Sequence, residues 1–219
     1  MAAPAHVGAS NERAKEIPRL REMQAILVPV KSFREAKQRL ADALGDETRI
    51  ALVKQLAEIV INARGSSPAF VACDNGEVAD WSITKGATVL WTPALGLSGA
   101  VGAGFRHLVS AGFSRIIIAH ADLPFVTDLE HFGSDSAVTI APDHRLDGTN
   151  VIAIPASTPF TFFYGPHSYQ RHLAEAAEQK MACHSVFDWR LASDIDHPDD
   201  LALVSDLLKQ QHSRKRAIS

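Results

Sequence analysis

Carboxylates at two places in the chain could together hold a hard metal ion. Asp122 follows the apolar run Arg115–Ala119, and Asp194 and Asp196 lie far downstream. If the downstream segment is extended, the i, i+2 spacing points Asp194 and Asp196 to one face. Carboxylate oxygens are the ligands that Mg²⁺ prefers, so these three acids predict a site for one or two Mg²⁺ ions. The alternative for Asp122 is a loop residue that caps its own backbone.

Two further acids of the downstream segment have a simpler interpretation. Asp199 and Asp200 follow Pro198 at a predicted helix start, where negative charge favours the helix dipole. We therefore interpret them as structural. Asp196 could also be a structural cap of this helix, whereas Asp194 lies too far from the helix start for that interpretation.

Three cations, Lys31, Lys37 and Arg39, follow the first apolar run, Gln24–Val30, within nine residues of one another. Phosphate binding needs mobile positive charge beside backbone N–H groups at a helix start. The alternative is an amphipathic helix with solvated basic side chains. Neither a P-loop nor a dinucleotide-binding glycine motif is present.

Glycine and hydroxyl side chains mark two more candidate positions. The turn Asp147–Asn150 leads into an apolar run, and Gly165 and Ser168 lie just before or at the start of a predicted helix. Glycine lets the backbone approach a ligand closely, and a serine with helix N–H groups can bind an anion. Each feature alone is simply a turn or a helix cap.

The elements that would position these residues alternate between strand and helix. Apolar runs predict strands at 24–30, 69–73, 88–91, 115–119, 137–141 and 150–154, and periodicity predicts helices at 33–63 (broken at Gly45-Asp46), 97–110, 167–180 and 198–210. This order predicts an α/β fold with a mostly parallel or mixed sheet covered by helices on both faces. Ligands in such folds bind at the carboxyl ends of the strands.

Composition excludes several classes of protein. The chain has 219 residues, a net charge of −3 and 46% hydrophobic residues, so it can bury a core and has no general basic field for nucleic acid. Two cysteines allow no disulfide framework and favour a cytoplasmic setting, and no stretch is long enough to cross a membrane. We expect a loose extension at 1–22, a single domain at 23–208 and a basic tail at 209–219.

Together these segments resemble one family, the phospholactate guanylyltransferases of deazaflavin coenzyme F-420 biosynthesis, from Gln24 to Leu208. The matching motifs are Val28-Pro29-Val30-Lys31 with Ala36-Lys37-x-Arg39-Leu40, Ala121-Asp122-Leu123-Pro124, Asp147-Gly148-Thr149-Asn150, Tyr164-Gly165-x-x-Ser168 with His172, and Asp194-x-Asp196-x-Pro198-x-Asp200-Leu201. The resemblance implies a glycosyltransferase-A-like nucleotidyltransferase fold. It also implies GTP as donor and 2-phospho-L-lactate, phosphoenolpyruvate or 3-phospho-D-glycerate as acceptor, with release of pyrophosphate.

The resemblance also implies roles for individual residues. Asp122, Asp194 and Asp196 would be catalytic Mg²⁺ ligands. Lys31, a further catalytic residue, would hold the acceptor with Thr149, Gly165 and Ser168. Lys37 and Arg39 would bind the nucleotide with Gly96, Leu97 and Ser98, although Ser98 replaces the family's usual asparagine. His120, Tyr164 and His197 replace a usual proline, phenylalanine and threonine next to this site.

Two alternatives remain open at this point. A sugar-phosphate nucleotidyltransferase or glycosyltransferase would use the same fold, and Asp194-x-Asp196 resembles a glycosyltransferase metal motif. A non-catalytic nucleotide-binding relative would be expected to lose acids, yet all three are present. We expect GTP and a small phosphorylated acid as partners and neither nucleic acid nor membrane. A homodimer is left open.

Overall fold

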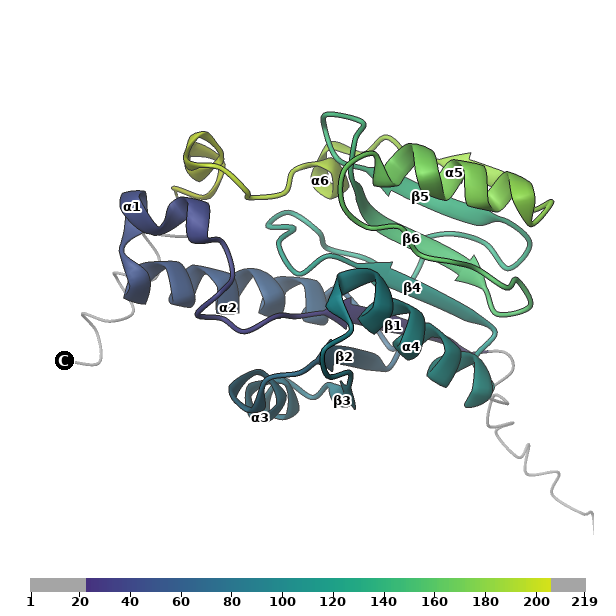
Figure 1. Cartoon of the computed structure of the whole chain (residues 1–219), viewed down its shortest axis with the longest axis horizontal. Coiled ribbons are helices and arrows are strands. Elements are labelled where there is room, and N and C mark those ends of the chain that lie inside the picture. The colour runs from purple at the N-terminus through teal and green to yellow at the C-terminus, as the bar shows by residue number, and fades with distance from the viewer. Residues whose placement is uncertain (1–22, 206–219) are drawn as a thin grey trace, which may run out of the picture.

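The computed structural model describes residues 23–205 of the chain, and these form one mixed sheet covered by helices (Figure 1). The predicted extension at 1–22, the predicted tail at 209–219 and the last residues of the predicted final helix lie outside the described residues. The strands are β1 (Gln24–Pro29), β2 (Ala69–Cys73), β3 (Thr88–Trp91), β4 (Arg115–Ala119), β5 (Val138–Pro142), β6 (Thr149–Pro155) and β7 (Cys183–Ser185). The helices are α1 (Ala41–Leu44), α2 (Asp46–Asn62), α3 (Gly76–Thr84), α4 (Gly96–Ser110), α5 (Ser168–Glu178) and α6 (Trp189–Ala192), with 3₁₀ turns η2 (Gln38–Leu40) and η3 (Pro198–Val204).

The strand order is β3-β2-β1-β4-β6-β5-β7. Strand β6 runs antiparallel to both of its neighbours, β4 and β5, and the other pairs are parallel. The predicted mostly parallel, mixed sheet is therefore confirmed. Because β6 is reversed, its first residue, Thr149, lies at the edge where the parallel strands end.

Alternating strand residues bury the two faces of the sheet under different helices. In β1, Ile26 and Val28 pack in the core with residues of α2 and α3, while Ala25 and Leu27 pack with residues of α4 and α5. This period of two is what a strand covered on both faces requires. No helix among the described residues is both long and apolar enough to cross a bilayer.

A third, smaller apolar cluster joins segments that are far apart in the sequence. Leu40, Leu52 and Leu56 pack against Ile195 and Val204, and all five side chains are fully buried. This contact fixes η2 and the middle of α2 against the segment that carries Asp194 and Asp196. It therefore sets the position of two groups of candidate site residues.

The predicted elements differ from the structure in four places. Residues 33–37 form turns rather than the start of a helix, and the helix predicted over 33–63 is divided into η2, α1 and α2. Helix α3 was not predicted: the turn-type sequence Asp74-Asn75-Gly76 leads into it, and Asn75 caps it, its side chain accepting a hydrogen bond from the Val78 N–H. The short elements β7 and α6 were not predicted. The segment after Pro198 begins as a 3₁₀ turn.

Candidate active site

A cleft of about 640 Å³ opens at the edge where β1 and β4 end. Its lining includes predicted site residues from five parts of the chain: Lys31, Lys37 and Arg39, then Leu97, Asp122, Gly165 and Asp196. A smaller hollow of about 180 Å³ shares Lys31 and Leu97 with the cleft and is also lined by Asp74, Thr92 and Gly96. The fold thus brings most of the sequence-predicted site residues to one edge of the sheet.

Asp122, Asp194 and Asp196 form a compact group, which we call the acid cluster. One carboxylate oxygen of each lies within 4.8 Å of those of the other two. Asp122 follows β4, and the other two acids flank Ile195, whose side chain is fully buried in the third apolar cluster. With Ile195 buried, its neighbours Asp194 and Asp196 both face Asp122, as the i, i+2 spacing predicted.

Asp194 is held in an unfavourable environment for a negative charge. Its side chain is 15% exposed, and burial, followed by repulsion from Asp122 and Asp196, raises its pKa to about 6. Asn150 donates a hydrogen bond of 3.5 Å to Asp194 and another of 2.9 Å to the Leu191 carbonyl. His144 places its Nδ1 atom 3.9 Å from Asp194. Asn150 therefore ties the start of β6 to the acid cluster.

Lys37 inserts its ammonium group between the other two acids. Its Nζ atom contacts Asp122 Oδ2 and Asp196 Oδ1, and its side chain is 12% exposed. Burial alone would lower the pKa of Lys37, but the charges of Asp122 and Asp196 outweigh it and raise that pKa. Burial would raise the pKa of Asp196, but the Lys37 charge and hydrogen bond outweigh it and lower that pKa. The structure thus places Lys37 in direct contact with the acid cluster.

The acid cluster fits a hard divalent cation. The donor set consists of carboxylate oxygens, which Mg²⁺ and Mn²⁺ prefer. Asp122 Oδ1 is buried and has no hydrogen-bond partner within residues 23–205, so one acceptor atom is left for a ligand to satisfy. A cation at this position would also relieve the repulsion that raises the pKa of Asp194.

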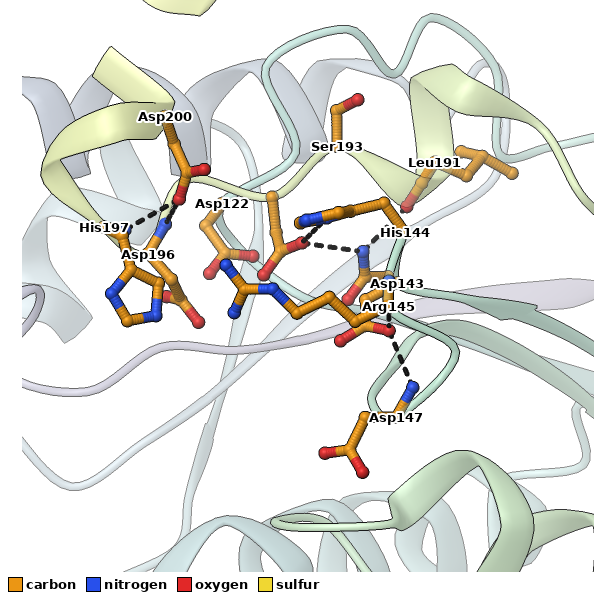
Figure 2. A network of polar contacts seen from close by, with 12 residues as sticks. Asp122, Asp143, His144, Arg145, Asp147, Leu191, Ser193, Asp196, His197 and Asp200 are labelled. Carbon is orange, nitrogen blue, oxygen red and sulfur yellow. Dashed lines mark hydrogen bonds and ion pairs between the residues drawn. The ribbon is translucent and has the colours of Figure 1, made fainter.

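Asp200 acts on the backbone beside the acid cluster. Its Oδ2 atom accepts hydrogen bonds from the Asp196 N–H at 2.9 Å and the His197 N–H at 2.7 Å (Figure 2). These bonds satisfy N–H groups at the start of η3, as the structural interpretation of Asp200 predicted. They also fix the backbone that carries Asp196.

Thr149 contacts His172, and Ser168 lies on the same helix as His172, but these three described residues are buried and do not line the cleft. Ser168 and His172 are buried one turn apart on α5, so they share one face of that helix. His172 Nε2 accepts a hydrogen bond from the Phe163 N–H at 2.9 Å, so its proton is on Nδ1, which lies 3.0 Å from Thr149 Oγ1. Thr149 therefore accepts this bond, and its own hydroxyl proton is left to donate. Burial lowers the pKa of His172 to about 4, which keeps the ring neutral.

The turn Asp147–Asn150 and the segment 165–168 are joined directly, as their predicted common role requires. The Asp147 carboxylate accepts a hydrogen bond from the His167 N–H at 3.1 Å, and its carbonyl accepts one from the Tyr169 N–H at 2.9 Å. Gly165 adopts φ +112°, a conformation that side chains disfavour, so glycine is required for its backbone here. Figure 2 shows the Asp143–Asp147 loop beside the acid cluster.

The remaining predicted residues divide into two groups. Lys31 is exposed at the cleft and makes no ion pair with any described residue. Arg39 lines the cleft and approaches His197, with 3.4 Å between Nη1 and Nε2. Ser98, in contrast, accepts a hydrogen bond from the Tyr164 N–H at 2.9 Å and is not among the residues that line the cleft. Its side chain secures the 160–165 segment to α4.

Two residues near the site were named from the sequence without a role. The Asn150 amide, which contacts Asp194, was seen only as part of a turn motif. His120 lines the cleft next to the ring of Tyr164, at 5.1 Å between ring centroids, and its buried Nε2 atom has no hydrogen-bond partner among the described residues. Burial lowers the pKa of His120. An apolar strand followed by a histidine was the available signal.

Comparison with solved structures identifies the class of protein. The structure is similar to a putative nucleotide-diphospho-sugar transferase from Desulfovibrio desulfuricans G20, with a TM-score of 0.64, 14% identity, and coverage of 86% of this chain and 98% of the other. The mixed sheet and this likeness define a glycosyltransferase-A-like nucleotidyltransferase fold.

Comparison of sequences identifies the family within that class. Residues 23–214 match the model of the family described as "Guanylyl transferase CofC like", and the chain belongs to this family. A phosphoenolpyruvate guanylyltransferase of Chloroflexus aggregans is 30% identical over 82% of this chain and 95% of its own length. A 3-phospho-D-glycerate guanylyltransferase of Phenylobacterium zucineum is 27% identical over 84% of this chain and 90% of its own length. The protein is thus a nucleotidyltransferase of the guanylyltransferase type, as the sequence motifs predicted.

Proposed function

We propose that the protein joins GTP to a small phosphorylated three-carbon acid and releases pyrophosphate, as a step in coenzyme F-420 biosynthesis. The observation that carries this proposal is that Asp122 and Asp196 of the acid cluster line one cleft together with Lys31 and Gly165. A divalent-cation site and groups suited to anions are therefore next to each other. Among the three acceptors implied by the sequence motifs, we expect phosphoenolpyruvate to react best, because relatives with this named activity reach 30% identity.

The reaction requires positioning more than proton transfer. An oxygen of the acceptor's phosphate forms a bond to the α-phosphorus of GTP, and the bond from that phosphorus to the β-phosphate oxygen breaks, so pyrophosphate leaves with the electron pair. The attacking oxygen is already anionic, so no general base is needed. The protein must instead hold two mutually repelling anions together.

We assign these tasks to residues at the cleft and to residues packed next to it. Asp122, Asp194 and Asp196 would hold Mg²⁺, which when bound neutralises charge on the triphosphate. Lys31, Gly165, Thr149 and Ser168 would hold the acceptor, with the Thr149 hydroxyl free to donate because His172 supplies the bond it accepts. Arg39, Gly96 and Leu97 would contact the nucleotide. Ser98 would not contact it but would hold the 160–165 segment against α4.

A release assay tests this function. Purified protein with Mg²⁺ is offered GTP and each of the three phosphoacids in turn, and then ATP, CTP or UTP with the best acceptor. We expect pyrophosphate release that needs a phosphoacid, prefers GTP and stops in excess chelator. Equal use of all four nucleotides would contradict the donor assignment, and full activity in chelator would contradict the metal assignment.

A further inference from the structure

Lys37 contacts the same carboxylates that would hold the metal. Its Nζ atom is bonded to one oxygen of Asp122 and one of Asp196, and the carboxylate oxygens of the acid cluster lie within 4.8 Å of each other. Mg²⁺ binds oxygen ligands at about 2.0–2.1 Å in strict geometry. An ammonium group in contact with two of the three carboxylates fills the space in which such an ion would bind. It also neutralises part of the negative charge that would attract the ion.

The ammonium group of Lys37 also has alternative partners within reach. It lines the 640 Å³ cleft beside Gln38 and Arg39, and a lysine side chain is a compact charge on a flexible stem. A triphosphate bound in the cleft would offer anionic oxygens to this ammonium. The contacts with Asp122 and Asp196 can therefore be exchanged for contacts with the nucleotide.

We propose that Lys37 and the divalent cation are alternative occupants of the acid cluster, and that Lys37 moves from the carboxylates to the nucleotide's phosphates when the metal binds. This inference rests on the proposed metal-dependent function. Its consequence is thermodynamic coupling between metal and nucleotide. When the metal binds alone, it displaces the Lys37 ammonium from the carboxylates and leaves it without a new partner. When the nucleotide is also bound, its phosphates become that partner. Each ligand then strengthens the binding of the other.

Mn²⁺ titration without nucleotide, followed by calorimetry, tests this competition. We compare the wild type, Lys37→Met and Lys31→Gln, the last being a matched loss of one cleft cation that touches no described carboxylate. We expect Lys37→Met to bind Mn²⁺ at least about tenfold more tightly than the wild type, as loss of a charge-assisted competitor implies. We expect Lys31→Gln to differ from the wild type by about threefold at most.

A second measurement uses the unaltered enzyme, in case Lys37→Met fails to fold. The rate at which an amine-acylating reagent modifies Lys37 is followed by mass spectrometry. We expect Mg²⁺ alone to speed modification severalfold, because it frees the ammonium, and Mg²⁺ with a non-hydrolysable GTP analogue to suppress it again.

The possible failures are distinguishable. Equal or weaker Mn²⁺ binding by folded Lys37→Met, or unchanged acylation of Lys37 with Mg²⁺, would overturn the competition while leaving metal-dependent pyrophosphate release intact. If wild-type protein bound no Mn²⁺ even with the GTP analogue and released pyrophosphate in chelator, both this inference and the proposed function would be overturned.

Discussion

The acid cluster and the Thr149–His172 contact lie at the same edge of the sheet but are stabilised differently. In the acid cluster three carboxylates approach within 4.8 Å, one of their oxygens lacks a partner in the part of the chain that the structure describes, and Lys37 compensates only part of the charge. In the Thr149–His172 contact, both ring nitrogens of His172 have hydrogen-bond partners and the ring is neutral.

This difference indicates what each side is built to receive. A site whose charges repel one another gains free energy when a cation binds. A buried, satisfied network is already rigid and can present a hydroxyl in one orientation. The first side is therefore incomplete without a ligand, and the second is complete before one arrives.

The largest effect is expected from removing one charge of the acid cluster. Asp194→Asn should lower turnover about a hundredfold or more, because a carboxylate that binds the metal is lost. Steady-state pyrophosphate release measures this. Asp199→Asn is the matched control, since Asp199 is an exposed acid of the same segment, and it should retain nearly full turnover. Equal losses in the two variants would contradict the division of this segment.

The two sides should also respond to pH with opposite sign in metal-free buffer. Asp194 has a pKa of about 6 in the folded protein against an ordinary value of 3.8. Between these values the folded protein holds a proton that the unfolded chain has lost, so stability falls as pH rises through about 6. His172 has a pKa of about 4 against 6.5, so the stability that it contributes is complete above pH 6.5 and is lost as pH falls through about 4.

Denaturant titrations from pH 4 to 8 measure the contributions of Asp194 and His172 to the free energy of unfolding. Each contribution is expected to reach at most about 3 kcal/mol. Asp194→Asn should therefore be more stable than the wild type at pH 8 and lose that advantage near pH 4. His172→Asn should remove the part of the stability loss that the wild type shows as pH falls from 6.5 to about 4. A destabilised Asp194→Asn at pH 8 without metal would show that the acid cluster is not under repulsion.

A smaller effect is expected at the border between the two sides. Lys31→Gln should raise the KM for the phosphoacid about tenfold to a hundredfold, because one charge-assisted contact is lost, at about 1.5–3 kcal/mol. The KM for GTP should change much less, and Lys31→Arg should restore little, because a planar guanidinium does not replace a compact ammonium. A selective loss of GTP affinity would contradict this assignment and show that Lys31 binds the nucleotide instead of the phosphoacid.

The smallest effect is expected at Asp200. Asp200→Asn retains an oxygen that can accept from the Asp196 and His197 N–H groups but loses the charge at the start of η3. We expect about 0.3–1 kcal/mol of lost stability and a modest change in turnover. Thermal unfolding together with kinetics would show whether Asp200 acts only through the backbone.

The sequence predicted the strands better than the contacts at their ends. Apolar runs such as Arg115–Ala119 were confirmed because burial on both faces demands them. Strand β7 was missed because three residues give no period and it forms by pairing with β5. The acids were predicted together from the fold rule, but Lys37 reaches partners 85 and 159 residues away. Such contacts depend on the packing of Leu40 against Ile195, which no local pattern encodes.

The most direct test of the account is ³¹P NMR of a reaction containing GTP, phosphoenolpyruvate and Mg²⁺. We expect equal amounts of pyrophosphate and of a new product in which the acceptor's phosphate is joined to GMP, and neither in excess chelator or with Asp194→Asn. Formation of GDP and inorganic phosphate, or of the joined product in chelator, would contradict it.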